Sequence, residues 1–303
     1  MGKCLITGAA GYIGSALAEF LIKRNIAVDL WDNFSTPSNF KSIECIPIEK
    51  VDIRDQDLDV SDYEVIFHLA GIVGIGPCEE RSDEAFDVNV KGTFNLLRTC
   101  KGRFIFASSS AVYGEAKDPE ITEESPIAPR STYGENKLEA EKLIQLLDNF
   151  CILRFSNVYG KALSYKRTVA DCFIENALAG KELTIHGDGK QRRDFVHVKD
   201  VVKSYWYAMN SAACSVMNIG GNEALNINEI ARLVCDDHRE IFGLTPPIKH
   251  IPIDCGVVWK DFFYLSKLAK VLISYTPGYS IKDEIRRRLN AHARNQKKSI
   301  KRT

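Results

Sequence analysis

The chain has 303 residues, of which 45% are hydrophobic, so it can bury a substantial core and form one large domain or two smaller ones. Lysine plus arginine and aspartate plus glutamate each number 40, and this balance excludes a global field that would draw the protein to nucleic acid or an anionic membrane. Nine cysteines without a CxxC spacing, no signal-peptide pattern and no long apolar stretch lead us to expect a soluble cytoplasmic protein with reduced thiols, no metal site and no membrane helix.

Short β-rich runs alternate with helical patterns through the first half of the chain. The runs are "KCLIT", "AVDLW", "CIPIEK", "EVIFHLA", "RFIFASS" and "CILRFSNVYG", and helices are expected at 12–24, 82–101 and 131–149. This alternation indicates βαβ crossovers. It therefore predicts an α/β fold with a doubly wound parallel sheet covered on both faces.

The pattern becomes irregular after Gly160. Helices are expected at 167–179, 198–210 and 226–242, with a turn-rich stretch "HGDGKQRRD" between the first two. We therefore predict a first domain over 1–160 and a smaller α/β lobe over 161–303. The tail after about residue 290 is expected to be disordered.

A glycine loop follows the first β-run, in "CLITGAAGYIGSALAEFLIKRN". Gly8, Gly11 and Gly14 allow a tight turn and a close backbone approach to a pyrophosphate, and the helix that begins at Tyr12 and Ile13 offers its positive N-terminus. Three glycines alone are weak support, but a strand before them and a helix after them favour a dinucleotide site.

The second β-run ends in Asp32 and Asn33. A carboxylate at this spacing can accept hydrogen bonds from an adenosine ribose, and it would repel the extra phosphate of NADP, so NAD is the expected cofactor. The alternative is that Asp32 only ends a strand. After the third run, Asp52 and Ile53 could reach the adenine.

Tyr133 and Lys137 stand four apart in "YGENK", so both can project from one helical face toward a reacting centre. A nearby ammonium stabilises a phenolate and is expected to lower the tyrosine pKa. Alone, this spacing is more typical of an ordinary amphipathic helix. The strand "FIFASSSAVYG" ends in hydroxyls at a sheet edge where such folds bind ligands, and Ser109 among them favours the catalytic interpretation.

The combined motifs resemble the extended short-chain dehydrogenase/reductase family, and specifically its nucleotide-sugar members of the epimerase/dehydratase type. The resemblance covers nearly the whole chain through "TGAAGYIG", "HLAG", "NVKGTFNLL", "SSSAVYG", "YGENK", "RFSNVYG", "RRDFVHVKDVV" and "MNIGGNEALNINEIA". It implies a Rossmann-type sheet, a C-terminal substrate lobe, NAD as cofactor and a nucleotide-diphosphate sugar as substrate.

In this family the tyrosine exchanges a proton with the sugar hydroxyl, and the lysine lowers its pKa and holds the nicotinamide ribose. Those roles fall on Tyr133 and Lys137. Aligned on "VYG", Ser109 takes the place of the catalytic serine or threonine, with Ser108 as the alternative. The resemblance extends the cofactor site to Leu69, Ala70, Gly71 and Asn89.

On the substrate side, Ser109 and Ser110 are joined by two residues that match family phosphate contacts. Asn157 resembles the asparagine that contacts the sugar-nucleotide phosphates, and Arg193 resembles the arginine that pairs with the pyrophosphate, with Arg192 as the alternative.

The chain also departs from the family pattern. Val73 and Lys161 replace a common lysine and proline. In "IPIDCGVVWKDFFYLSK" a second pyrophosphate arginine is missing, because the usual arginine and two aspartates are replaced by Asp254, Val257 and Tyr264. Its work could pass to Lys249 or Lys260.

Ser110 and Ala111 stand where dehydratases of this family carry an Asp-Glu pair, so dehydration lacks its acid and base. We therefore expect a nucleotide-sugar 4-epimerase, favouring UDP-sugars. A C4-dehydrogenase or 4-ketoreductase is the alternative, and a cofactor-binding scaffold protein without chemistry is a more distant one. The resemblance further implies a homodimer formed through helices 82–101 and 131–149.

Overall fold

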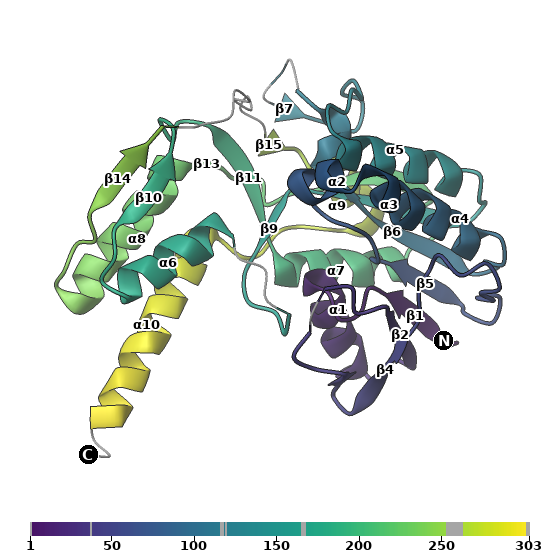
Figure 1. Cartoon of the computed structure of the whole chain (residues 1–303), viewed down its shortest axis with the longest axis horizontal. Coiled ribbons are helices and arrows are strands. Elements are labelled where there is room, and N and C mark those ends of the chain that lie inside the picture. Colours follow the sequence, from purple (N-terminus) through teal and green to yellow (C-terminus); the bar gives the residue numbers. More distant parts are fainter. Residues whose placement is uncertain are drawn as a thin grey trace.

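The computed structural model shows two lobes with the chain passing between them more than once (Figure 1). The residues that it describes are 2–36, 38–115, 118, 120–164, 168–252 and 263–300. Asp254, Val257 and Lys260, which bear on the missing arginine, lie outside this part of the chain.

The larger lobe is built on a sheet of eight strands in the order β12-β8-β6-β5-β1-β2-β4-β3. These strands are β1 (Cys4–Thr7), β2 (Val28–Asp32), β3 (Ser42–Ile43), β4 (Ile46–Lys50), β5 (Val65–His68), β6 (Arg103–Ser109), β8 (Phe150–Phe155) and β12 (Ser215–Ile219). All neighbours pair in parallel except β3 and β4. The strand order reverses at β1, and the carboxyl ends of β1 and β5 there mark the position where such sheets bind ligands. The predicted Rossmann-type fold is confirmed.

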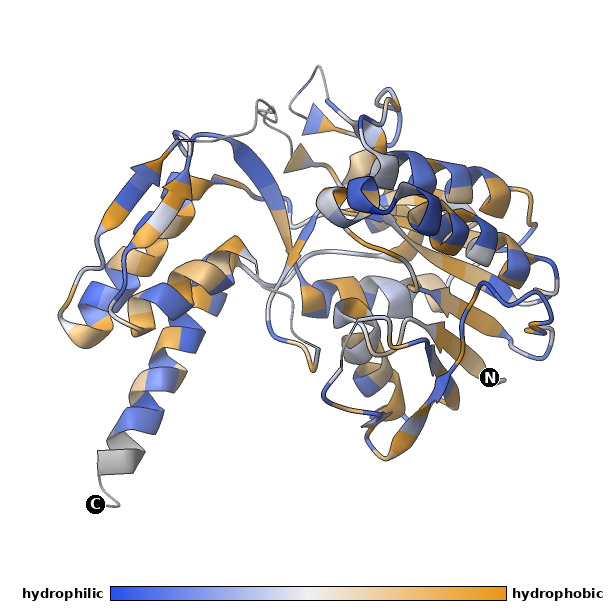
Figure 2. Ribbon diagram, viewed as in Figure 1, coloured by the Kyte–Doolittle hydropathy of each residue, from blue (hydrophilic) through white to orange (hydrophobic). Residues whose placement is uncertain are grey.

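Helices cover both faces of this sheet (Figure 1). One face carries α1 (Tyr12–Ile22), α7 (Val198–Met209) and α9 (Lys267–Ile273), which share an apolar core with the sheet. The other face carries α2 (Ile75–Glu80), α3 (Ser82–Phe86), the π-helical turn η1 (Asp87–Lys91), α4 (Gly92–Leu97) and α5 (Thr132–Ile144). Figure 2 shows hydrophobic residues along the strands of the sheet and hydrophilic residues on the outer side of α3 to α5. The helices therefore cover the apolar faces of the sheet and expose their polar sides to water.

The smaller lobe combines two short sheets with three helices. Its strands are β9 (Asn157–Tyr159), β11 (Arg192–His197) and β13 (Ala224–Asn226) in one sheet, and β10 (Leu183–His186) and β14 (Ile248–Ile251) in the other. Its helices are α6 (Val169–Leu178), α8 (Ile227–Phe242) and α10 (Ile281–Ile300), packed around a separate apolar core. A two-stranded ribbon of β7 (Glu120–Ile121) and β15 (Phe263–Tyr264) lies between the lobes, and the 3₁₀ turn η2 (Ser110–Tyr113) follows β6.

Three expectations differ from the structure. The run "CILRFSNVYG" is two strands rather than one, because β8 joins the large sheet and β9 pairs with β11 in the smaller lobe. The lobes do not divide at residue 160, since β12, α7 and α9 return to the large sheet and its core. The chain after residue 290 was expected to be disordered, but α10 continues through it to Ile300.

Within the described residues, no helix is long and apolar enough to cross a membrane, and no group of histidine, cysteine, aspartate and glutamate side chains could hold a metal ion. The cysteines of that part are free, and Cys4, Cys78, Cys151 and Cys235 are buried.

Candidate active site

The glycine loop lies at the carboxyl end of β1, where the sheet order reverses. Gly8 has φ +74°, and a Cβ there would lie 2.6 Å from the Ala70 backbone nitrogen. At Gly14 a Cβ would lie 2.1 Å from the Gly8 carbonyl oxygen. Only glycine fits at these two positions, because the loop folds back onto β5 and onto α1.

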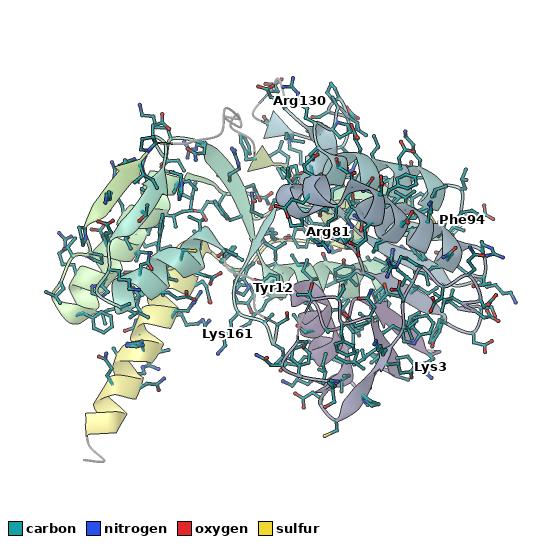
Figure 3. All side chains as sticks on the ribbon, viewed as in Figure 1. Lys3, Tyr12, Arg81, Phe94, Arg130 and Lys161 are labelled. Carbon is teal, nitrogen blue, oxygen red and sulfur yellow. The ribbon has the colours of Figure 1, made fainter. Side chains whose placement is uncertain are left out.

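The first turn of α1 is left open for an anion. Its N-cap is Gly11, which has no side chain to accept from the first N–H groups at Tyr12 and Ile13. Those groups and the helix dipole favour a bound phosphate. The Tyr12 hydroxyl donates to the Gly160 carbonyl oxygen at 2.6 Å, so the loop is also tied to the start of the smaller lobe. Figure 3 shows Tyr12 and Lys161 at this junction.

Asp32 ends β2 beside the loop. Its carboxylate accepts from the backbone nitrogens of Ala10 at 3.0 Å and Phe34 at 2.7 Å, and burial raises its pKa. A carboxylate has further acceptor sites, so Asp32 can still bind a ribose hydroxyl. The alternative in which Asp32 only ends the strand does not account for its bond across to the glycine loop.

Asp52 lies next to Asn33, whose side chain donates to it at 3.1 Å. The Arg54 guanidinium binds the same carboxylate at 3.0 and 2.6 Å and holds its pKa well below the usual range. Asp52 is therefore a fixed anion at the edge of β4. Ile53 beside it is buried against Gly92.

The loop after β5 is held by a buried histidine that the motif analysis did not single out. His68 is 0% exposed, and its ring lies between the hydroxyls of Thr7, 2.7 Å from Nδ1, and Thr93, 2.9 Å from Nε2. Because the Thr93 hydroxyl donates to the Asn89 carbonyl oxygen, His68 Nε2 is the donor and Nδ1 the acceptor. The ring is therefore neutral, in agreement with burial lowering its pKa to about 3.

This network fixes Leu69, Ala70 and Gly71. The Ala70 nitrogen donates to the Thr7 hydroxyl at 3.3 Å, and the Leu69 nitrogen donates to the Thr7 carbonyl oxygen at 3.1 Å. Asn89, from η1, binds both the nitrogen and the oxygen of the Ile72 backbone, at 2.8 and 3.0 Å. The predicted cofactor residues of β1, β5 and η1 therefore line one edge of the sheet.

Tyr133 and Lys137 come from the first two turns of α5. Ser131 caps the helix by accepting from the Gly134 nitrogen at 3.1 Å, and Glu79 of α2 binds the backbone nitrogen and hydroxyl of Thr132. The Lys137 ammonium lies 5.9 Å from the Tyr133 ring centre, so the predicted shared face is confirmed. The Tyr133 phenol lies beside the Ser109 hydroxyl at the end of β6.

Lys137 is almost completely buried, with 3% of its surface exposed. Its ammonium donates to the Ala107 carbonyl oxygen at 2.8 Å and lies 4.6 Å from the Phe106 ring centre. Burial lowers its pKa to about 8, which still leaves it charged at pH 7. A charged lysine on the buried stripe of a helix is unusual and marks the site.

The low pKa expected for Tyr133 is not found in the protein alone. Burial raises the pKa of Tyr133 to about 12, and the neighbouring Ser109 hydroxyl only reduces this increase. Loss of solvent disfavours the phenolate more strongly than the Lys137 ammonium favours it.

The choice between Ser108 and Ser109 is decided by the direction of their side chains. Ser108 is buried and its hydroxyl donates to Glu141, whereas Ser109 is partly exposed and meets Tyr133. Ser110 begins η2, and its side chain lies near the buried phenol of Tyr264. Ser109 is thus the serine at the tyrosine, as predicted.

The predicted phosphate contacts lie on adjoining strands of the smaller lobe. Asn157 in β9 is in register with Phe195 in β11, two residues beyond Arg193. Because alternate residues of a strand share a face, Asn157 and Arg193 lie on one side of this sheet. The Asn157 amide donates to the Asp194 carbonyl oxygen at 3.0 Å, while the exposed Arg192 donates to the Ala224 carbonyl oxygen at 2.7 Å.

Of the candidates for the missing arginine, Lys249 lies on the outlying β14 and pairs with Glu182 at 3.2 Å. Tyr264, which stands where the family pattern has an aspartate, is fully buried in β15. Val73 is 52% exposed on the loop before α2.

The chain is similar to known proteins in both sequence and structure. The family model described as "NAD dependent epimerase/dehydratase family" matches residues 4–220. A protein of Methanocaldococcus jannaschii that bears the provisional name UDP-glucose 4-epimerase is 33% identical over 94% of this chain and 97% of its own length. The UDP-N-acetyl-alpha-D-glucosaminuronate decarboxylase of Bacillus cytotoxicus is 34% identical over 83% of this chain and 84% of its own. The crystal structure of the UDP-glucose 4-epimerase of Thermotoga maritima with UDP-glucose has a TM-score of 0.84 and 27% identity, covering 97% of this chain and 99% of that chain.

Proposed function

We propose that this chain, which belongs to the NAD-dependent epimerase/dehydratase family, is a nucleotide-sugar 4-epimerase that favours UDP-sugars. Membership of the family makes it an NAD-dependent enzyme of the nucleotide-sugar epimerase/dehydratase type. The finer assignment rests on one observation. Ser109, Tyr133 and Lys137 converge near Gly71, in the loop that Gly8 approaches, while Ser110 and Ala111 occupy the two positions where dehydration would need an acid and a base.

The residues around the glycine loop fit a dinucleotide, since glycines allow the close approach, an open helix N-terminus faces the phosphates and a carboxylate serves a ribose. We assign NAD to the residues Gly8, Gly11, Tyr12, Ile13, Gly14, Asp32, Asn33, Asp52, Ile53, Leu69, Ala70, Gly71, Asn89, Tyr133 and Lys137. When bound, NAD supplies a hydride acceptor that later becomes a hydride donor.

Tyr133 exchanges the proton of the sugar C4 hydroxyl in this proposal. Ser109 donates a hydrogen bond to the same oxygen, which holds it against the phenol while C4 is oxidised to a ketone. Tyr133 then returns the proton when C4 is reduced from its other face. Since the pKa of Tyr133 is raised to about 12 in the protein alone, proton acceptance depends on positive charge being brought near the phenolate.

Lys137 provides such a charge from the protein itself. Its pKa of about 8 keeps it protonated at neutral pH, and its contacts with Ala107 and Phe106 fix the ammonium on the Tyr133 side of α5. The ammonium lies 5.9 Å from the Tyr133 ring centre. A buried cation is little screened by water over such a distance, so it favours the phenolate as the proton leaves.

The substrate's phosphates are assigned to Asn157 and Arg193 on the shared face of β9 and β11. Arginine can bind two phosphate oxygens at once, which suits a diphosphate. Ser109 and Ser110 complete the proposed substrate contacts at the end of β6. The names of the relatives include both a 4-epimerase and a decarboxylase, so the reaction needs a direct test.

The test incubates the purified protein, without added cofactor, with UDP-glucose, UDP-N-acetylglucosamine, UDP-glucuronate and GDP-mannose. NMR should detect a product inverted at C4, and Tyr133→Phe should remove this activity without changing the NAD content. A ketosugar formed with stoichiometric NADH would favour a C4-dehydrogenase, and release of carbon dioxide from UDP-glucuronate would favour a decarboxylase. Either result would overturn the 4-epimerase assignment.

We also propose that the protein is a homodimer formed through α3, α4 and α5. Phe86 is 41% exposed and Phe94 is 50% exposed about two helical turns apart in this region, and large exposed aromatic side chains favour an interface. Phe94 lies at the outer edge of the molecule (Figure 3).

A further inference from the structure

A buried charged pair lies directly behind the proposed proton-transfer residues. Glu141, one turn beyond Lys137 in α5, is 0% exposed, and Arg154 in β8 is 3% exposed. The Arg154 guanidinium binds both carboxylate oxygens of Glu141, at 2.9 Å from Nε and 2.6 Å from Nη2. Removing water from two charges is costly unless they are paired in good geometry, so this pair needs a reason beyond filling the core.

Three contacts join α5 to three consecutive residues of β6. Tyr133 meets Ser109, Lys137 donates to the Ala107 carbonyl oxygen at 2.8 Å, and Glu141 accepts from the Ser108 hydroxyl. Residues 133, 137 and 141 follow one another by single turns, so they form one stripe on the helix. Glu141 supplies the ionic contact of that stripe, and Arg154 fixes it from behind.

Arg154 extends the same network to the turn that follows Ser109. It lies opposite Ser108 in the sheet register, and its Nη1 donates to the Tyr113 hydroxyl at 2.8 Å. The Tyr113 hydroxyl donates in turn to Asn218 of β12 at 2.7 Å. The network therefore links α5, η2 and three neighbouring strands of the sheet beneath the site.

We propose that Glu141 and Arg154 are positioning residues, which hold α5 in register with β6 so that Tyr133, Lys137 and Ser109 stay aligned on the reacting sugar oxygen. Neither contacts the substrate. Because a displacement of about 1 Å at a reacting centre costs about 10²-fold in rate, the loss of this pair should lower kcat more than it raises KM. The catalytic part of this inference rests on the proposed function.

Glu141 also acts on the charge of Lys137. The groups that face Lys137 are Cys78 from α2, His68 from β5, and Tyr133 and Glu141 from its own helix, with Arg154 behind Glu141. Burial lowers the pKa of Lys137, and Cys78 and Glu141 both act against this lowering. Glu141→Gln keeps the shape of the side chain but removes its negative charge, so the pKa of Lys137 should fall further. Because the proposed reaction uses the charged form of Lys137, the alkaline limb of the pH–rate profile should move to lower pH.

A second buried arginine provides a matched control. Arg103 begins β6 at the opposite end of the strand, is 5% exposed, and donates to Ala208, Asn149 and Ala213 at 3.0, 2.7 and 2.6 Å. Arg103→Met therefore removes an equally buried and equally bonded guanidinium from the same sheet, far from the carboxyl edge. If Arg154 had a purely structural role, both substitutions would lower the stability of the protein, and neither would lower the kcat of the folded enzyme.

The experiment compares Glu141→Gln, Arg154→Met, Arg154→Lys and Arg103→Met with the unmodified enzyme. We expect Glu141→Gln and Arg154→Met to lower kcat about 10²-fold with KM within about threefold, Arg154→Lys to recover part of the loss, and Arg103→Met to keep kcat within about threefold. Equal losses of kcat in Arg154→Met and Arg103→Met, or an unmoved alkaline limb in Glu141→Gln, would overturn the proposal.

Amide hydrogen exchange in α5 gives a reading that does not depend on the substrate. Exchange over Thr132–Ile144 should be faster in Glu141→Gln and Arg154→Lys, which are mild enough to fold, and unchanged in Arg103→Met. If the unmodified protein turns over no nucleotide sugar, the proposed function fails, but faster exchange confined to the first two variants would still support the positioning of α5. Unchanged exchange in both would contradict it.

Discussion

Gly14→Ala tests the glycine loop most sharply, because the structure gives the size of the clash. The added Cβ would lie 2.1 Å from the Gly8 carbonyl oxygen and 2.9 Å from its carbon, both backbone atoms. An ordinary carbon–oxygen contact is about 3.3 Å, so the loop and α1 must separate by about 1 Å. Overpacking of this kind costs about 1–3 kcal/mol, and it moves the N–H groups that would bind the pyrophosphate.

We therefore expect Gly14→Ala to bind NAD at least about 10²-fold more weakly, because the displaced loop and α1 no longer place their N–H donors on the pyrophosphate. The assay is the NAD content of the purified protein, followed by titration of the apoprotein calorimetrically. Gly76→Ala is the control, since a Cβ there meets nothing within 4 Å. If Gly14→Ala binds NAD as tightly as Gly76→Ala, the loop is not the cofactor site and the reasoning fails.

Three further predictions follow from buried charge and exposed aromatic surface. The pKa of Lys137 is lowered from 10.5 to about 8, so its buried ammonium costs stability below pH 8, and this cost disappears as the pH rises toward 10.5. Lys137→Met should therefore have a free energy of unfolding at pH 7 that is higher by about 1–3 kcal/mol, as measured by denaturant unfolding, and should lose activity. The pKa of His68 is lowered from 6.5 to about 3, so the stability that this residue contributes is complete above pH 6.5 and falls as the pH drops toward 3. His68→Gln should flatten this dependence, whose full size is about 5 kcal/mol. Phe94→Glu, at a side chain 50% exposed, should convert a dimer to a monomer in light scattering.

Each of these has a clear contrary result. A Lys137→Met protein that is less stable at pH 7 would mean that the ammonium is well accommodated by its contacts. An unchanged acid dependence in His68→Gln would mean that His68 is not held neutral. An unmodified protein that is already monomeric would contradict the proposed interface, whatever the behaviour of Phe94→Glu.

The sheet and its helices were predictable because each signal is local. Buried parallel strands give continuous apolar runs, and helices on the sheet give a periodic apolar stripe. The shared helical face of Tyr133 and Lys137 was predictable for a similar reason, since their spacing determines it whatever surrounds the helix.

The remaining features depend on contacts between distant segments. Nothing in "RFSNVYG" indicates that the strand breaks at Ser156, because the break arises when Asn157 joins a strand some 40 residues later. The pKa of Tyr133 was predicted in the wrong direction because the spacing gives the position of the ammonium but not the loss of water around the phenol. Glu141 and Arg154 were missed because a charged residue in a helix or strand pattern is normally exposed. The signal that could have found Glu141 is its place on the stripe of Tyr133 and Lys137, which also carries Ala140 and Ile144 toward the core.

The central claim is that hydride leaves C4 of a nucleotide sugar and returns to the same carbon within one binding event. It is tested most directly with a UDP-sugar carrying deuterium at C4, incubated with the purified protein in ordinary water without added cofactor. We predict a product inverted at C4 that keeps its deuterium, as measured by NMR and mass spectrometry. Recovery of a ketosugar, or of C4-inverted product that has lost its deuterium, would contradict the claim.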